Sequence, residues 1–155
     1  MPFRISGLDP APFQPFFGLS EAELRKHHIQ RYHVTEPNMC PDRVEMRDLD
    51  PGETALLLNY EHLPVDSPYR SRHAIYVREG AQSAVDVVGT VPEMMASRLL
   101  ALRAIDQEGC IIDAEIAEGR AIEPIIAAFF EEQNCRYIHA HFARRGCYAG
   151  LITRA

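Results

Sequence analysis

Two histidines near the end of the chain are spaced for chemistry on one face of a strand. From Tyr137 to Phe142 the sequence alternates ring-bearing polar residues with apolar ones, and successive side chains of a strand point to opposite faces. We therefore expect His139 and His141 to share a face, with their Cα atoms about 7 Å apart. Two imidazoles at that separation can reach one metal ion, one phosphate or one substrate, and histidine serves as acid or base near neutral pH.

A zinc or iron centre is one chemistry that this pair would support. Catalytic metal sites hold the ion with three protein ligands and leave one position open. His139 and His141 would supply two ligands, with a divalent metal such as Zn as the cofactor. The residues whose types suit the third position are Cys147, Cys40, His62, Glu61 and Asp113. The alternative is that both histidines lie on a solvated strand face and bind nothing.

Cys147 is a candidate nucleophile, and Cys40 is a second one. A reactive cysteine needs a nearby base and positively charged surroundings that favour the thiolate. The two histidines would supply the base, and Arg144 and Arg145 would supply the charge. Against this chemistry stands the tendency of free cysteine to be buried in protein cores.

The hairpin after the histidines decides where the Cys147 thiol points. A three-residue loop over residues 144–146 turns the thiol to the histidine face. A four-residue loop over residues 143–146 pairs His141 with Tyr148 instead and turns the thiol toward the core. We favour the three-residue loop.

A polar connection in the middle of the chain is a third candidate. The stretch from Leu63 to His73 is stiffened by two prolines and carries two arginines, and polar loops are common places for binding residues. Arginine binds phosphate and carboxylate through a planar fork. We therefore expect a pocket for a small anionic ligand between residues 59–73 and residues 139–148. Its expected ligand-binding residues are Asn59, His62, Tyr69, Arg70 and His73, and its expected catalytic residues are His139, His141 and Cys147.

The elements that must position these residues are mostly strands. Alternating or wholly apolar runs predict strands over residues 29–35, 54–62, 74–79, 99–105 and 110–116, besides the strand of the histidines. Leu99–Ile105 also fits a helical spacing, but the turn sequence Asp106–Gly109 that follows favours a strand in a hairpin.

Two helices are signalled in the sequence. Ser20 and Glu23 form a capping box at the start of a helix over residues 20–27. Ile122–Gln133 carries an apolar stripe at helical spacing and is the clearest helix. Because the strands mostly follow one another as hairpins, we predict an α+β fold: a largely antiparallel sheet with one long amphipathic helix and short helices packed on it.

Composition limits the class of protein. A chain of 155 residues suits a single domain, residues 1–155, that needs no disulfide or structural metal to fold. The net charge of −6 argues against nucleic-acid partners and anionic membranes. No apolar run has membrane-spanning or signal-peptide length, and the four cysteines include no Cys-x-x-Cys pair. We expect a cytoplasmic protein with reduced thiols and a small-molecule ligand, and its oligomeric state stays open.

Several segments of the chain together resemble one uncharacterised bacterial family, catalogued as domain of unknown function 1203. The segments that carry the resemblance are Leu56–Arg70, Tyr76–Gly80, Tyr137–His141 and Gly146–Tyr148. The resemblance implies a stand-alone bacterial protein of about this size with no assigned activity, and it transfers no catalytic residue. The family pattern often places an asparagine and a further cysteine where this chain has Phe142 and Gly150, which argues against a metal site that needs them.

Three functions follow from these patterns. The first is binding of a small anionic ligand in a pocket lined by histidine and arginine, with enzymatic activity left open. The second is a metal-dependent enzyme, and the third is a non-enzymatic interaction module. The positions of five residues distinguish these functions: Asn59, His62, Arg70, His139 and His141. If they converge on one concave pocket, binding or catalysis is favoured, and if they are scattered over the surface, an interaction module is favoured.

Overall fold

Two antiparallel sheets make up most of the protein, in a computed structural model that describes residues 2–155. The larger sheet has the order β5-β1-β9-β8-β6-β7, and the smaller has the order β2-β3-β4. The strands of the larger sheet are β1 (Phe3–Ser6), β5 (Asp86–Val88), β6 (Leu99–Ile105), β7 (Ile111–Glu118), β8 (Tyr137–Phe142) and β9 (Tyr148–Arg154). Those of the smaller sheet are β2 (Gln30–His33), β3 (Thr54–Leu63) and β4 (Ser71–Arg78).

The predicted α+β fold with one long amphipathic helix is wrong. Within residues 2–155 the structure is mostly β, with 39% strand and 16% helix. The predicted Ile122–Gln133 helix is the short α3 (Glu123–Glu131). It is shorter because Pro124 is tolerated only in a first turn, which fixes the start, and because Glu132 already has extended backbone angles. The other helical segments are α1 (Glu21–Arg25), α2 (Glu93–Ala96), and the 3-10 turns η1 (Gln14–Phe16) and η2 (Gly119–Ala121).

Several local predictions are confirmed. The ambiguous run Leu99–Ile105 is the strand β6, and it pairs with β7 as a hairpin. The side chain of Ser20 accepts a hydrogen bond from the backbone N–H of Glu23 at 3.2 Å and so starts α1. No helix within residues 2–155 is long and apolar enough to cross a membrane.

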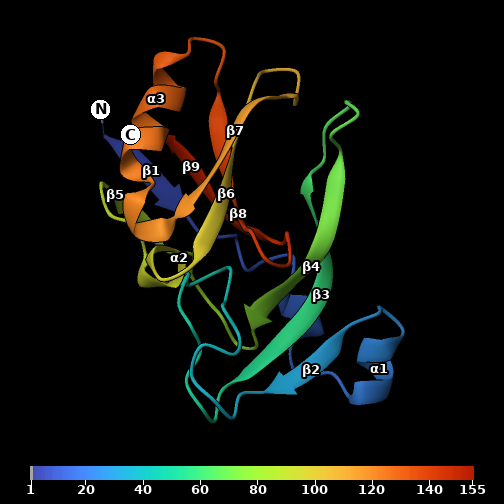
Figure 1. The fold of residues 1–155 in the computed structure, drawn as a ribbon. Helices are drawn as coiled ribbons and strands as arrows, with labels where there is room; N and C mark the ends of the chain where they lie inside the picture. Colours follow the sequence, from blue (N-terminus) through green and yellow to red (C-terminus); the bar gives the residue numbers. More distant parts are fainter. Residues whose placement is uncertain (1) are drawn as a thin grey trace.

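One face of the larger sheet is the main core of the protein. Leu100 and Leu102 of β6 and Ile138 and Ala140 of β8 are fully buried there. Phe130 of α3 is among the residues that cover them, and Figure 1 shows α3 lying along this side of the sheet. Because strand side chains alternate, the other face of β8 carries the histidines.

The smaller sheet stands against that second face of the larger sheet (Figure 1). Its own core contains Leu56 and Leu58 of β3 with Ile75 and Val77 of β4. Tyr148 of β9 is buried in the same apolar cluster, so it connects the two sheets. The sheets therefore meet where β3 ends and where the β8–β9 hairpin turns.

Candidate functional site

His139 and His141 share a face of β8, as their spacing predicts, but that face is not solvated. His139 is 6% exposed and His141 is 1% exposed. The apolar residues between and beside them, Ile138 and Ala140, belong to the core on the other side of the sheet. The two histidines are therefore interior residues of the contact between the sheets.

A third histidine joins the pair from the smaller sheet. His62, near the end of β3 and 8% exposed, has its ring centroid 4.8 Å from that of His141 and 6.1 Å from that of His139. The rings of His139 and His141 are 6.2 Å apart. We call His62, His139 and His141 the histidine cluster. Tyr148 stacks on His62 with ring centroids 5.7 Å apart.

The hydrogen bonds of the cluster are unequal. Nδ1 of His141 donates to the carbonyl of Gly146 at 2.9 Å, because a carbonyl can only accept. Nε2 of His141 is then the acceptor that faces Nη1 of Arg103 at 3.4 Å. The Nδ1 atoms of His62 and His139 are buried and have no hydrogen-bond partner among residues 2–155. Two rings of the cluster thus carry an unsatisfied polar atom, which is costly in a protein interior.

Burial keeps the cluster uncharged at neutral pH. It lowers the pKa of His62 to about 4 and the pKa values of His139 and His141 to about 3. The charge of Arg103 lowers all three pKa values further, since a nearby cation disfavours the protonated imidazole. Arg103 is the one charged residue in the apolar run Leu99–Ile105, a signal that the sequence offers and that the prediction did not use.

The cluster does not form a ready metal site. Over residues 2–155, no group of three or more histidine, cysteine, aspartate and glutamate side chains is arranged to hold a metal ion. The guanidinium of Arg103 beside His141 would also repel a cation. Of the residues predicted for a third ligand, His62 joins the pair, whereas Glu61 pairs with Arg70 at 3.2 Å and Asp113 is exposed.

The predicted ligand-binding residues fall into different places. Arg70 lies in its exposed pair with Glu61, Tyr69 is exposed, and Asn59 accepts a hydrogen bond from the side chain of Arg72. His62 belongs to the histidine cluster. His73 lies on β4 and lines a cavity. Of the five residues chosen to distinguish a pocket from an interaction surface, His62, His139 and His141 come together in the histidine cluster, whereas Asn59 and Arg70 are held in other contacts. None of the five lines the cavity that His73 lines.

The favoured register of the hairpin is wrong. His141 pairs with Tyr148, so the loop contains residues 143–146, and Gly146 adopts a positive φ of 81°. In this register the large ring of Tyr148 packs on the histidine face, and Cys147 points to the opposite side, where it is 8% exposed. Both registers allow Gly146 its positive φ, so loop length alone cannot decide between them.

A cavity of about 820 Å³ lies between β4 and the β8–β9 hairpin. Arginines are its main polar lining: Arg43, Arg98, Arg144 and Arg145. We call it the arginine cavity. Other residues that line it include Tyr32, His73, Tyr76, Phe142 and Cys147, with Glu118 as the one carboxylate among the lining residues that the structure describes. His73 and Cys147 are thus the predicted site residues that it brings together.

Arg43 is the most unusual residue of the cavity. It is 1% exposed, its Nε donates to the carbonyl of Tyr148 at 2.8 Å, and its Nη1 donates to the carbonyl of Pro41 at 2.6 Å. Its Nη2 lies 3.0 Å from Sγ of Cys147, and its guanidinium stacks 4.9 Å from the ring of Phe142. Burial lowers the pKa of Arg43, and Cys147 acts in the opposite direction.

No carboxylate pairs with Arg43 within residues 2–155, where the ion pairs involve other arginines and Lys26. Arg144 and Arg145 also take part in none of these pairs and are exposed at the hairpin. Arg98 differs, since Asp48 holds it at 2.6 Å. Three of the four arginines thus bring charge that no carboxylate of the described chain neutralises by contact.

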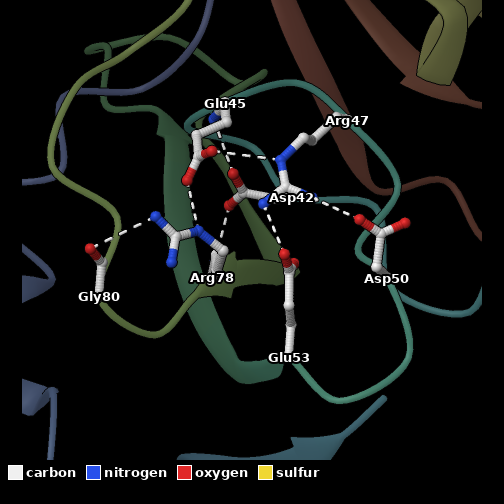
Figure 2. A network of polar contacts seen from close by, with 7 residues as sticks. All are labelled: Asp42, Glu45, Arg47, Asp50, Glu53, Arg78 and Gly80. Carbon is white, nitrogen blue, oxygen red and sulfur yellow. Dashed lines mark hydrogen bonds and ion pairs between the residues drawn. The ribbon is translucent and has the colours of Figure 1, made fainter. Parts of the chain in front are cut away.

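A polar network holds the segment that carries Arg43 (Figure 2). The buried carboxylate of Asp42 accepts hydrogen bonds from the backbone N–H groups of Glu45 at 2.6 Å and Arg78 at 2.7 Å. Glu45 in turn pairs with the side chains of Arg78 and Arg47. This segment is irregular in sequence and in structure, so no periodic pattern could have pointed to Arg43.

Comparison with known proteins gives one match. The family model described as "Protein of unknown function (DUF1203)" matches residues 39–154. This match confirms the resemblance predicted from Leu56–Arg70 and the hairpin segments. No curated protein and no solved structure matches the chain.

Proposed function

The chain belongs to the family described as "Protein of unknown function (DUF1203)", and from the geometry of the arginine cavity we propose that it binds a small anionic ligand there. The ligand would lie between β4 and the β8–β9 hairpin, in the arginine cavity. The observation that carries the proposal is the buried, carboxylate-free guanidinium of Arg43 at the wall of that cavity.

Charge favours an anion in this place. Leaving a cation buried without an anionic partner is expensive, and a bound carboxylate or phosphate would offset that cost. Arg144 and Arg145 line the same cavity from the hairpin loop, and arginine binds planar or tetrahedral oxyanions through paired N–H donors. A local concentration of positive charge on a chain of net charge −6 suits a small anion better than a nucleic acid.

Size and apolar lining favour a ligand larger than an inorganic ion. About 820 Å³ is within the range of small-molecule sites, which combine an apolar wall with a few polar groups. Tyr32, Tyr76 and Phe142 offer such a wall beside the arginines. We therefore expect an anionic group joined to a planar or apolar body.

The other predicted functions have less support. An acid or base role for His139 and His141 stays a prediction, because neither lines the cavity. A metal-dependent activity has no preformed group of ligands within residues 2–155. An interaction module would not require a cavity in which arginines lack carboxylate partners.

Calorimetric titration with phenyl phosphate and with inorganic phosphate tests the proposal. We expect phenyl phosphate to bind more tightly than phosphate, and we expect Arg144→Ser/Arg145→Ser to weaken both by about tenfold or more, because a charge-assisted hydrogen bond contributes about 1.5–3 kcal/mol. The control is Arg25→Ser/Arg136→Ser, which removes two exposed arginines that do not line the cavity. Equal loss in both variants would mean general charge attraction and would contradict a site.

A further inference from the structure

The outer edge of the larger sheet is open at β7. This strand is the last one of the sheet, and no strand within residues 2–155 pairs with its outer side (Figure 1). It is eight residues long and residues 112–116 are all exposed, whereas β5 at the opposite edge has only three residues. An edge strand presents backbone N–H and C=O groups without partners, and a strand of another chain can pair with them. β7 is therefore the longer of the two edges at which this sheet could be extended.

Two carboxylates shield part of this edge. Asp113 accepts a hydrogen bond from the backbone N–H of Ala114 at 2.8 Å, and Glu115 accepts one from the backbone N–H of Ile116 at 3.1 Å. In an antiparallel ladder alternate residues turn their N–H and C=O groups away from the neighbouring strand, so these two N–H groups face outward. Exposed side chains change rotamer quickly. A strand that accepted the two N–H groups would therefore release both carboxylates next to its own side chains.

Two isoleucines of β7 are exposed although they are large and apolar. Ile116 is 60% exposed and Ile112 is 40% exposed. Ile116 lies opposite Ala101 of β6, on the face of the sheet that carries the histidines. Branched apolar side chains favour strand pairing, whereas edges that are only shielded usually carry lysine or proline. The isoleucines thus give an incoming strand apolar surface to cover.

A cavity of about 510 Å³ lies between β7 and α3. Its charged lining residues are all carboxylates, namely Asp113, Glu131 and Glu132. We call it the acidic groove. No arginine or lysine of the described chain lines it, and its three carboxylates take part in none of the ion pairs of residues 2–155. The charge beside the open edge is therefore of one sign and favours a cationic partner.

The charges of β7 decide against a second copy of the chain as the partner. Two copies could join β7 to β7 in antiparallel fashion, with the outward N–H groups paired and the greatest overlap, if the pairing were centred at Ala114 or at Glu115. The first register places Asp113 opposite Glu115 of the other copy, and the second places Glu115 opposite itself. Like charges directly opposite each other destabilise a strand pair. A strand that carries basic residues at those places has no such repulsion.

We propose that β7 is a docking edge for a basic strand of another protein. The strand adds to the larger sheet antiparallel to β7, by backbone hydrogen bonds. Its apolar residues lie beside Ile116, and its lysine or arginine residues lie beside Asp113 and Glu115 and reach toward the acidic groove. The proposal is independent of the anion site, because Glu118 is the only residue of β7 that lines the arginine cavity.

Binding of designed peptides to the unaltered protein tests the proposal, with fluorescence anisotropy as the measurement. The first peptide has blocked ends, is as long as β7 with its eight residues, and alternates lysine with valine. The second has the same length and alternates glutamate with valine. We expect the lysine peptide to bind at least about tenfold more tightly than the glutamate peptide, because only the former complements the carboxylates of the edge.

Methylation of the peptide backbone separates strand pairing from charge attraction. In the antiparallel arrangement the peptide residues opposite Ala114 and Ile116 exchange hydrogen bonds with them, and these residues are the valines on the apolar face. Methylation of the valine nitrogens should therefore weaken binding by about tenfold or more. Methylation of the lysine nitrogens, which point away from β7, should leave the affinity nearly unchanged. Equal affinity of both methylated peptides, or the reverse order, would contradict the proposal.

Variants of the protein locate the peptide. Asp113→Asn/Glu115→Gln should weaken binding of the lysine peptide by about fivefold or more. The matched control is Glu36→Gln/Asp66→Asn, which neutralises two exposed carboxylates that do not line the acidic groove and should leave the affinity nearly unchanged. Ile116→Lys should also abolish binding, because it places a charge on the apolar face of the edge. Circular dichroism checks the fold of each variant, and the peptide comparisons do not depend on the variants.

Three further results would overturn the proposal. The first is no binding of the lysine peptide at a concentration of about 1 mM. The second is an unchanged affinity in Asp113→Asn/Glu115→Gln, which would place the peptide elsewhere on the protein. The third is a dimer in analytical ultracentrifugation that Ile116→Lys dissociates, which would assign the edge to a second copy of the chain.

Discussion

The ring of His62 lies nearly parallel to the ring of Tyr148, at 14° and with 5.7 Å between centroids, and so joins the end of β3 to the start of β9. This stack is the centre of the contact between the sheets, with His139 and His141 on its other sides. Because the interior of this contact contains uncharged imidazoles, the stability of the contact should depend on pH.

Acid should weaken the fold over a defined range. In the folded protein the pKa values of the three cluster histidines are lowered to between about 3 and about 4, whereas unfolded histidine has a pKa near 6.5. Below pH 6.5 the unfolded chain therefore binds more protons, and the free energy of unfolding falls as the pH is lowered toward 3. We expect a loss of at least about 2 kcal/mol between pH 7 and pH 4.5, measured by urea unfolding.

The control for that experiment is His141→Gln. It removes one titrating ring, so it should reduce the slope of stability against pH between pH 6.5 and pH 4.5. An unchanged slope would assign the acid sensitivity to other groups.

A matched pair of variants tests the unsatisfied nitrogen of His139. His139→Leu removes a ring whose Nδ1 has no partner, whereas His141→Leu removes one that donates to Gly146. The two changes are identical in chemistry and occur two residues apart on one strand face. His141→Leu should destabilise the protein more, by about 1 kcal/mol, because it also leaves the partly buried carbonyl of Gly146 without its donor. Thermal unfolding of both variants at pH 7.5 checks this, and the reverse order would contradict it.

The carboxylate of Asp42 should be essential to the segment that presents Arg43. Asp42→Ala leaves two backbone N–H groups without their acceptor and should cost about 2–4 kcal/mol. Asp50, in the same network (Figure 2), has an exposed carboxylate 3.9 Å from Arg47. Asp50→Ala should therefore leave the free energy of unfolding nearly unchanged in a urea titration. Similar losses in both variants would show that the network acts by general charge balance.

Glu79 makes a second contribution to stability that is lost in acid, and this loss occurs at lower pH than that of the histidine cluster. It accepts hydrogen bonds from Arg31, from Thr54 and from the backbone of Gly18, and the bond from Arg31 is the main cause that lowers its pKa to about 2. Because the folded pKa is below the unfolded value, this stability is present above pH 4.5 and is lost as the pH falls toward 2.

Glu79→Gln should therefore destabilise the protein at pH 7 by about 2 kcal/mol and by less at pH 3. Glu93→Gln, in an exposed pair with Arg120, should have almost no effect at either pH. Guanidinium chloride unfolding at the two pH values measures both variants. A Glu79→Gln loss that does not shrink with acid would exclude the proposed role.

Local patterns in the sequence predicted local structure well. The turn after Ile105 selected the strand β6 over a helix, and alternation placed His139 and His141 on one face. Such features depend on neighbours a few residues away, which the sequence displays directly. The arrival of His62 at the same face depends on how β3 packs on another sheet, and no periodicity encodes that contact.

The arginine cavity could not be predicted in full for the same reason. Of its lining residues, His73 and Cys147 were among the expected site residues, and they were chosen for their residue types. Arg43 was not among them, because it reaches Tyr148 across 105 positions of the chain from a segment without regular structure. The hairpin register was also missed, since the choice was decided by what Tyr148 packs on rather than by the loop.

The strand order of the larger sheet bears on how this protein is made in the cell. The strand nearest the start of the chain, β1, and the hairpin partner β8 both pair with β9. During translation, the middle of that sheet must therefore wait for residues 148–154 to leave the ribosome, while the β3–β4 hairpin has all of its pairing partners much earlier. Until then the side of β1 that β9 will occupy offers open backbone groups to any other nascent chain, a period in which protection by a chaperone would matter most.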